Sequence, residues 1–224
     1  MLSPGATMLD DFLPLPQRLA VNYAPARRRT ATAAMLALDA RLGELLARAS
    51  EPLLAQMRLA WWRDELGKPA ADRPRGDPVL DAIGAAWNGE EDALKGLVDG
   101  WEQLVAEPPL DDAALEVFVA ARAGAFAGLA RLAGHGAAVD DARAAGRLWA
   151  LADFAANASD PREHSGAIER ARDAAGPVPA MPRALRPLAV LAGLGRRAVA
   201  RGGGKLVAGR ADILVAMRLG MFGR

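Results

Sequence analysis

The segment Trp61-Trp62-Arg63-Asp64 combines residue types that could form a ligand site. Adjacent residues on a helix point about 100° apart, so one tryptophan can face the core while the other reaches a neighbouring helix or a groove. Core packing of the tryptophans with an exposed ion pair explains the same pattern, and it is the favoured interpretation.

Spacing alone does not predict a metal site or a nucleophile elsewhere. Asp99 and Glu102 lie one helical turn apart, but a divalent ion needs several converging oxygens, so a solvated helix face is expected. His135 falls in a predicted turn and His164 in a predicted loop, and both are expected to be exposed. The chain has no cysteine, which excludes disulfides, thiolate metal sites and a cysteine nucleophile.

The composition indicates a protein with a sizeable core and no affinity for nucleic acid. Of the 224 residues, 52% are hydrophobic, and 28 basic residues against 27 acidic residues give a net charge of +1. No basic stripe is interleaved with aromatic residues, so no nucleic-acid partner is expected. There is no secretory signal pattern, and no window offers the ~18 uncharged apolar residues of a membrane span. We therefore expect a cytoplasmic protein without a transmembrane span.

The sequence predicts an all-α fold. Val, Ile and Thr together account for only 18 residues, while helix-favouring Ala, Leu, Arg and Glu dominate. Apolar residues recur at helical spacing across residues 94–105. Residues 1–20 are expected to form a flexible segment and residues 21–224 a single helical domain. One helix is expected to begin at residue 77, and another at residues 51–66 is expected to be capped by Ser50. The other expected helices are at residues 30–49, 90–105, 111–132, 139–158, 183–201 and 210–221.

Two features leave the packing open. Residues 159–182 are expected to form a loop with a short helix. Small residues in the predicted helix 111–132 either leave room for a cavity beside one face or allow neighbouring helices to approach closely. These residues are Ala123, Gly124, Ala127 and Gly128.

Several segments resemble, in the same order, conserved segments of the squalene/phytoene synthase family. MLALD, from Met35, resembles the first catalytic helix, and AGRLWALADFAANASDP, from Ala145, falls at the second. GDPVLDAI, LVDGWEQL and FVAARAGAFAGLARLAG resemble the helices between them, and the last of these contains Arg122. The resemblance spans about residues 20–220. It implies a helical bundle of the isoprenoid-synthase type around an apolar cavity.

The resemblance also implies that Mg²⁺, held by aspartate pairs on two facing helices, binds the substrate diphosphates. In the first helix the expected acidic cluster falls on Gly43, Glu44 and Ala47, where only Glu44 is acidic. A shift of one helical turn would bring in Asp39.

In the second helix the expected aspartates fall on Asn157 and Pro161, with Asp153 and Asp160 nearby. A shift of one turn that recruits Asp153 does not restore both acidic pairs. One acid on each side is too few to hold three Mg²⁺ ions against two diphosphates.

The loss of these aspartates resembles the pattern in the divergent branch of the family, which includes the mitochondrial complex I assembly factor. Members of that branch also carry a segment similar to Trp61-Trp62-Arg63. The resemblance implies a protein without catalysis or cofactor that binds an isoprenoid lipid or a partner protein. Because isoprenoids are membrane-borne, peripheral membrane contact is also expected. The candidate pocket residues are Asp39, Glu44, Trp61, Trp62, Arg63, Arg122, Asp153, Asn157 and Asp160.

Two alternatives stay open. One is an active prenyl transferase that uses Mg²⁺ with Glu44, Asp153 and Asp160 and makes head-to-head condensation products. The other is a purely structural helical scaffold, with an apolar surface patch in place of a pocket.

Overall fold

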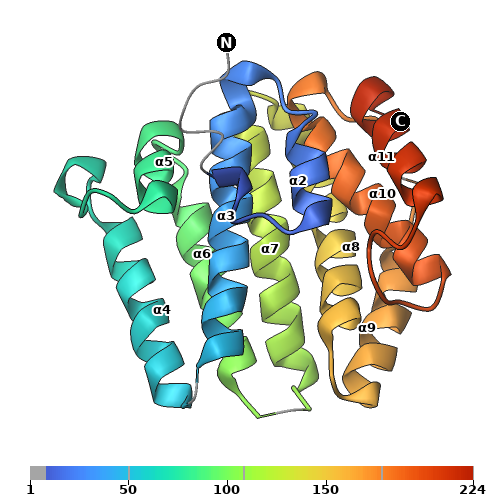
Figure 1. The fold of residues 1–224 in the computed structure, drawn as a ribbon, viewed down its shortest axis with the longest axis horizontal. Coiled ribbons are helices and arrows are strands. Elements are labelled where there is room, and N and C mark those ends of the chain that lie inside the picture. Colours follow the sequence, from blue (N-terminus) through green and yellow to red (C-terminus); the bar gives the residue numbers. More distant parts are fainter. Residues whose placement is uncertain (1–8, 50, 108, 178, 224) are drawn as a thin grey trace.

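The chain folds into an all-α bundle (Figure 1). The computed structural model describes residues 9–49, 51–107, 109–177 and 179–223, and these ranges contain no strand. The predicted all-α fold is confirmed. The helices are α2 (Leu15–Val21), α3 (Ala26–Arg48), α4 (Pro52–Gly67), α5 (Pro78–Ala86), α6 (Glu91–Glu102), α7 (Asp112–Leu132), α8 (Val139–Asn157), α9 (Pro161–Ala174), α10 (Arg186–Ala200) and α11 (Arg210–Phe222).

The long helices α3 and α7 lie in the middle of the bundle, as Figure 1 shows. Helix α7 packs against α6 on one side and against α8 on the other. Helices α4 and α5 extend the α6 side, whereas α9, α10 and α11 extend the α8 side. Helix α2 packs on α10 and also touches α3 and α11. Helices α4 and α11 therefore lie at opposite sides of the molecule.

Helix starts follow local sequence signals. The carboxylates of Asp77, Asp111 and Asp160 accept hydrogen bonds from backbone N–H groups in the first turns of α5, α7 and α9. Pro187 lies in the first turn of α10, where a missing N–H costs no helical hydrogen bond. The starts predicted at positions 77 and 111 are confirmed. Ser50, the expected cap of α4, lies outside the described residues.

Two segments are more ordered than expected. Residues 159–182 were expected to form a loop with a short helix, and they contain the 14-residue helix α9, which buries only three small or medium apolar side chains. The expectation of a flexible segment over residues 1–20 also differs from the structure in the part that is described. Residues 1–8 lie outside the described part of the chain, but Leu9 and Leu13 are buried and α2 follows directly. Residues 9–20 are therefore packed onto the bundle, because these leucines anchor them to the core.

Helix α7 differs from the expectation that no window is apolar enough for a membrane span. By length and composition alone it could cross a membrane. The relevant window is, however, 61% buried inside the bundle. The central helix of a globular bundle shows the same composition, and α7 occupies that position between α6 and α8.

The small residues of α7 serve close helix packing. A Cβ atom added at Gly128 would lie 2.6 Å from the Cβ of Ala93 on α6. One added at Gly146 of α8 would lie 2.8 Å from the Cα of Ala123. Of the two alternatives left open by the sequence, a cavity beside α7 or close packing of neighbouring helices, close packing is therefore found at Ala123 and Gly128.

Gly146→Ala is expected to lower the free energy of unfolding by about 1–3 kcal/mol, because the new methyl group must displace the α7 backbone. Gly124→Ala is the matched control. A Cβ atom there meets nothing within 4 Å, so its better helix propensity should raise stability by up to about 1 kcal/mol. Urea denaturation measures both values. A Gly146→Ala variant as stable as the control would refute the packing explanation.

Candidate functional site

A cavity of about 910 Å³ lies between α3, α7 and α8. Asp39, Gly43 and Glu44 of α3 line it together with Asp153 and Asn157 of α8. The end of α6, a segment around α2 and the loop before α11 complete its walls. The two helices that the sequence matched to the family's catalytic pair therefore share one cavity.

The guanidinium of Arg122, from α7, joins these two helices. Its Nε donates to Oδ1 of Asp39 at 2.8 Å and its Nη2 to Oδ2 at 2.6 Å, which makes a bidentate pair. Its Nη1 donates to Oδ2 of Asp153 at 2.8 Å. The side chains of Arg122 and Asp39 are each 3% exposed, and that of Asp153 is 20% exposed. One buried cation thus bridges a carboxylate from α3 and a carboxylate from α8.

Aromatic rings surround this cation. The guanidinium carbon lies 5.1 Å from the ring centre of Trp101, 4.8 Å from Phe118 and 4.3 Å from Trp149, within the range of cation–π attraction. The indole Nε1 of Trp101 donates to Oδ1 of Asp39 at 2.9 Å. We call Asp39, Trp101, Arg122 and Asp153 the arginine clamp.

The clamp stabilises the positive charge of Arg122. Burial alone would lower the pKa of Arg122, but the Coulombic attraction of Asp39 and Asp153 and the hydrogen bonds to them raise that pKa above its usual value. Burial raises the pKa of Asp153, and the attraction of Arg122 offsets only part of this shift. Arg122 therefore stays charged and does not act as a general acid near neutral pH.

Trp101 reaches the clamp over Gly43. A Cβ atom added at Gly43 would lie 2.9 Å from Cη2 of Trp101, closer than Cβ atoms normally approach other atoms. The missing side chain makes room for the indole. One position at which the resemblance places an acidic cluster is thus covered by a tryptophan ring.

Glu44 and Asn157 lie on the exposed part of the cavity lining. The carboxylate of Glu44 lies 3.8 Å from Arg48 on the same helix. The side-chain amide of Asn157 donates to the backbone carbonyl of Asp153 at 2.8 Å. Asp160 is separate from the residues that line the cavity, because its carboxylate caps α9.

The Trp61-Trp62-Arg63 segment lies on α4, outside the main cavity. Trp62 is buried and Trp61 is partly exposed, with their rings edge to face at 5.2 Å. Both contribute to a separate cavity of about 290 Å³. Arg63 donates to Asp99 at 2.6 Å and to Glu102 at 2.5 Å, which ties α4 to α6. This is the packing and ion-pair arrangement that the sequence favoured, and it also accounts for the two acids of α6.

Trp101, Phe118 and Trp149 contact the clamp but are not among the residues chosen from the sequence. One signal for them exists. Arg122 is a charged residue in the middle of an apolar helix, and a buried charge needs partners. Which aromatic and acidic residues supply them depends on the packing of α6, α7 and α8.

Asp212 fixes the loop Lys205–Val207, which forms part of the cavity wall. Its Oδ2 accepts from the backbone N–H of Ala208 at 2.9 Å. Its Oδ1 accepts from Arg197 at 2.7 Å and Arg201 at 2.8 Å. Burial alone would raise the pKa of Asp212, but these hydrogen bonds outweigh it and lower the pKa from 3.8 to about 2.

Asp212→Asn is expected to lower the free energy of unfolding by about 2 kcal/mol near neutral pH. Because the pKa of Asp212 is lower in the folded state, its contribution is complete above pH 3.8 and is lost as the pH falls toward 2. The parent protein and the Asp212→Asn variant should therefore converge in stability near pH 2. Urea denaturation across this range measures the effect. Asp140→Asn, at an exposed ion pair with Arg143, is the control and should change nothing measurable.

The donor set does not fit the Mg²⁺ ions that the resemblance implies. Both oxygens of Asp39 and one oxygen of Asp153 accept hydrogen bonds from the clamp, and the cation between them is Arg122. Within the described ranges, no three Asp, Glu, His or Cys side chains come close enough to hold a metal ion. The two aspartates of α3 and α8 that line the cavity, Asp39 and Asp153, are therefore already bound to a guanidinium.

Comparison with known proteins identifies the family. The family model described as squalene/phytoene synthase matches residues 18–198. The comparisons with curated proteins and with solved structures return no match. The matched range contains α3, α7 and α8 with the whole clamp, and the family implies the all-α isoprenoid-synthase fold that the bundle shows. The chain belongs to the squalene/phytoene synthase family.

Proposed function

We propose that this family member binds an isoprenoid chain in the cavity and does not carry out Mg²⁺-dependent diphosphate chemistry. The observation that carries the proposal is the position of Arg122. Its guanidinium forms hydrogen bonds to one acid from each of α3 and α8, the helices from which a metal site would be built. The clamp keeps the two helices together and leaves the rest of the cavity for an apolar molecule.

The charges of the cavity oppose a diphosphate. Four carboxylates and two cations line it, so its lining has a net charge of −2. Much of the remaining lining is apolar, including Leu104, Phe118, Phe154 and Leu206. Its volume lies within the usual range of about 300–1,000 Å³ for small-molecule sites. An uncharged prenyl lipid matches this combination better than an anionic one.

Gln17 indicates where a polar head group would bind. This residue of α2 is 4% exposed, and it lines the cavity. Its side-chain Oε1 is buried and has no hydrogen-bond partner within the described residues. A buried acceptor of this kind is costly unless a donor reaches it. A hydroxyl group at the end of a prenyl chain would supply that donor.

The two alternatives have less support. An active transferase would need Glu44, Asp153 and Asp160 to act together, but Asp160 caps α9 and Asp153 is bound to Arg122. A purely structural scaffold was expected to have a surface patch in place of a pocket. Helix α4 does expose apolar side chains, yet the chain also has a cavity, open to solvent on one side, that is lined in part by buried polar groups. The clamp is consistent with the divergent, assembly-factor-like branch of the family, to which we assign the chain as part of this proposal.

Binding of radiolabelled farnesol, followed by co-elution in size-exclusion chromatography, tests the proposal. Ala156→Phe places a phenyl ring in the cavity from α8 and should weaken binding roughly tenfold or more. Ala144→Phe places the same side chain on an exposed position of α8 and should leave binding unchanged. Gln17→Leu should weaken binding of farnesol but not of its methyl ether, which has no hydroxyl donor.

Incubation with radiolabelled farnesyl diphosphate and Mg²⁺ is the opposing test. Formation of a head-to-head C30 product would overturn the proposal. So would farnesol binding that Ala156→Phe does not weaken, because the ligand would then lie outside the cavity.

A further inference from the structure

Basic residues are concentrated at the C-terminal end of the sequence. Residues 177–224 contain nine of the 28 Lys and Arg residues but only one of the 27 Asp and Glu residues, a local net charge of +8 in a chain of net charge +1. That one acid, Asp212, is buried and paired with Arg197 and Arg201. The basic side chains that α10 and α11 expose therefore have no exposed acidic residue to balance them within the described part of this segment.

Helix α11 is apolar on its outward face. Its inner face, with Ala216 and Leu219, is buried against neighbouring helices. The outer face repeats at i, i+4 and i+8, so its side chains form a single stripe. Leu214 is 65% exposed and Phe222 is 63% exposed. The exposed apolar residues are Ile213, Leu214, Met217, Met221 and Phe222.

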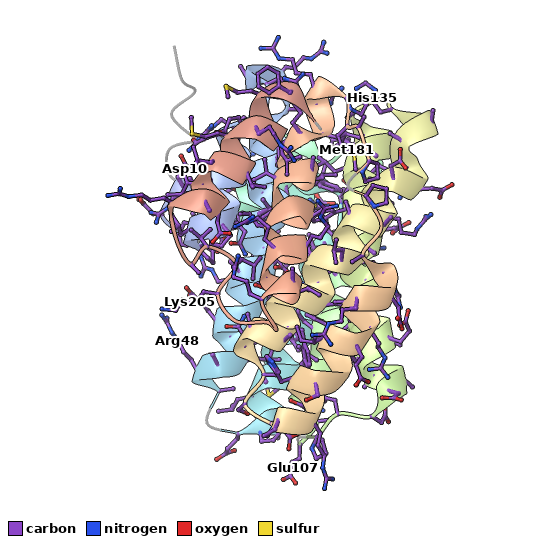
Figure 2. The ribbon with its side chains drawn as sticks, turned by 90° about the vertical axis from the view of Figure 1, so that its right-hand side faces the viewer. Asp10, Arg48, Glu107, His135, Met181 and Lys205 are labelled. Atoms are coloured by element: carbon purple, nitrogen blue, oxygen red, sulfur yellow. The ribbon has the colours of Figure 1, made fainter. Side chains whose placement is uncertain are left out.

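Arginines border this stripe. Arg210 begins the helix and Arg218 lies on its exposed side, and both are exposed. Arg196 of α10 is exposed too, and it lines a groove of about 560 Å³ with Leu214 and Arg218. Within the described residues, none of these three arginines takes part in an ion pair. Figure 2 faces this side of the molecule, with α11 at the outer surface.

Helix α4 provides an internal comparison. It also exposes an apolar stripe, which contains Leu53 and Met57. Its charges are balanced, however, because Arg58 and Arg63 are matched by Asp64 and Glu65. It lies on the opposite side of the bundle (Figure 1). Of these two helices, only α11 combines an exposed apolar face with an excess of positive charge.

We propose that α11 docks the protein on an anionic membrane surface. The helix lies in the plane of the interface, with Leu214, Met217 and Met221 against the acyl chains and the arginines on lipid phosphates. This combination of an apolar face with a basic border is the one that interfacial helices use. The proposal does not depend on a ligand in the cavity.

Co-sedimentation with phosphatidylcholine vesicles, with and without phosphatidylserine, tests this docking. The protein should bind only the vesicles that contain phosphatidylserine, and binding should fall as salt rises. Leu214→Ser combined with Met221→Ser should weaken binding roughly tenfold or more, and so should Arg210→Gln combined with Arg218→Gln. Leu53→Ser combined with Met57→Ser removes equally exposed apolar residues from α4 and should leave binding unchanged.

All substituted side chains are exposed, so circular dichroism and the melting temperature should match the parent protein. Equal binding to both vesicle types, or equal losses from the α11 and α4 variants, would overturn the proposal. So would a dimer in sedimentation velocity that the α11 substitutions abolish, because the stripe would then be covered by a second copy. Farnesol binding in lipid-free buffer should be the same for all these variants, which separates this result from the fate of the cavity proposal.

Discussion

Arg122→Met is expected to lower the free energy of unfolding by about 3–5 kcal/mol near neutral pH, the largest effect of any single substitution proposed for this chain. Methionine fills much of the same space, so the loss is mainly electrostatic. Without the guanidinium, Asp39 remains buried with only the Trp101 indole as a donor to its side chain, and Asp153 loses its cation. An uncompensated buried carboxylate is far more costly than a missing ion pair.

The sign of the pH dependence follows from the same contacts. Burial already raises the pKa of Asp153, and in the variant the attraction of Arg122 no longer offsets part of that shift. The folded state then binds more protons than the unfolded state, so the variant loses stability as the pH rises above the ordinary carboxyl range. Its deficit relative to the parent protein should therefore shrink on acidification toward about pH 4. Urea denaturation at several pH values measures this trend.

Arg63→Met is the matched control for Arg122→Met. Arg63 also binds two carboxylates, those of Asp99 and Glu102, but its side chain is 34% exposed. Solvent can replace the lost contacts, so the cost should stay below about 1 kcal/mol and show little pH dependence. If the two variants lose the same stability, burial does not make the clamp stronger than a surface ion pair.

Local signals were sufficient for most of the fold. Asp77-Pro78 and Asp111 mark helix starts by the chemistry of their own side chains, and the apolar spacing of residues 94–105 matches α6 and the 3-10 turn that follows it. A short helix was expected within residues 159–182, but the bounds and the 14-residue length of α9 were not, because its sequence is mostly polar with a narrow buried face. The order of residues 9–20 depends on the core into which Leu9 and Leu13 pack, and no local pattern describes that core.

The site was predictable only in part. The resemblance placed Glu44 and Asn157 on two facing helices, and both line the cavity. It did not show that Arg122 lies between Asp39 and Asp153, which are 83 and 31 residues away from it in sequence. Such a contact depends on the tertiary packing of three helices. The sequence did hold one clue, because a lone arginine inside an apolar helix requires a buried acceptor.

Gly43→Asp tests whether an acidic motif can be restored on α3, and we expect it to lower the free energy of unfolding by about 3 kcal/mol. The new Cβ atom would lie 2.9 Å from Trp101, so the indole must move and release Oδ1 of Asp39. The added carboxylate also lies one helical turn from Asp39 and repels it. Calorimetric titration of the variant with Mg²⁺ should show no specific binding, because Asp39 and Asp153 remain bound to Arg122.

A double-mutant cycle isolates the steric part of this effect. In a Trp101→Ala background the indole is gone, so Gly43→Asp should cost less there, with a coupling energy of about 1–2 kcal/mol. Gly96→Asp on α6 is the matched control, because a Cβ atom at that position meets nothing within 4 Å. Gly96→Asp should therefore change the free energy of unfolding only slightly. If Gly43→Asp were as harmless as Gly96→Asp, or if it created a Mg²⁺ site, the proposal that Trp101 and Arg122 exclude the ion from this cavity would fail.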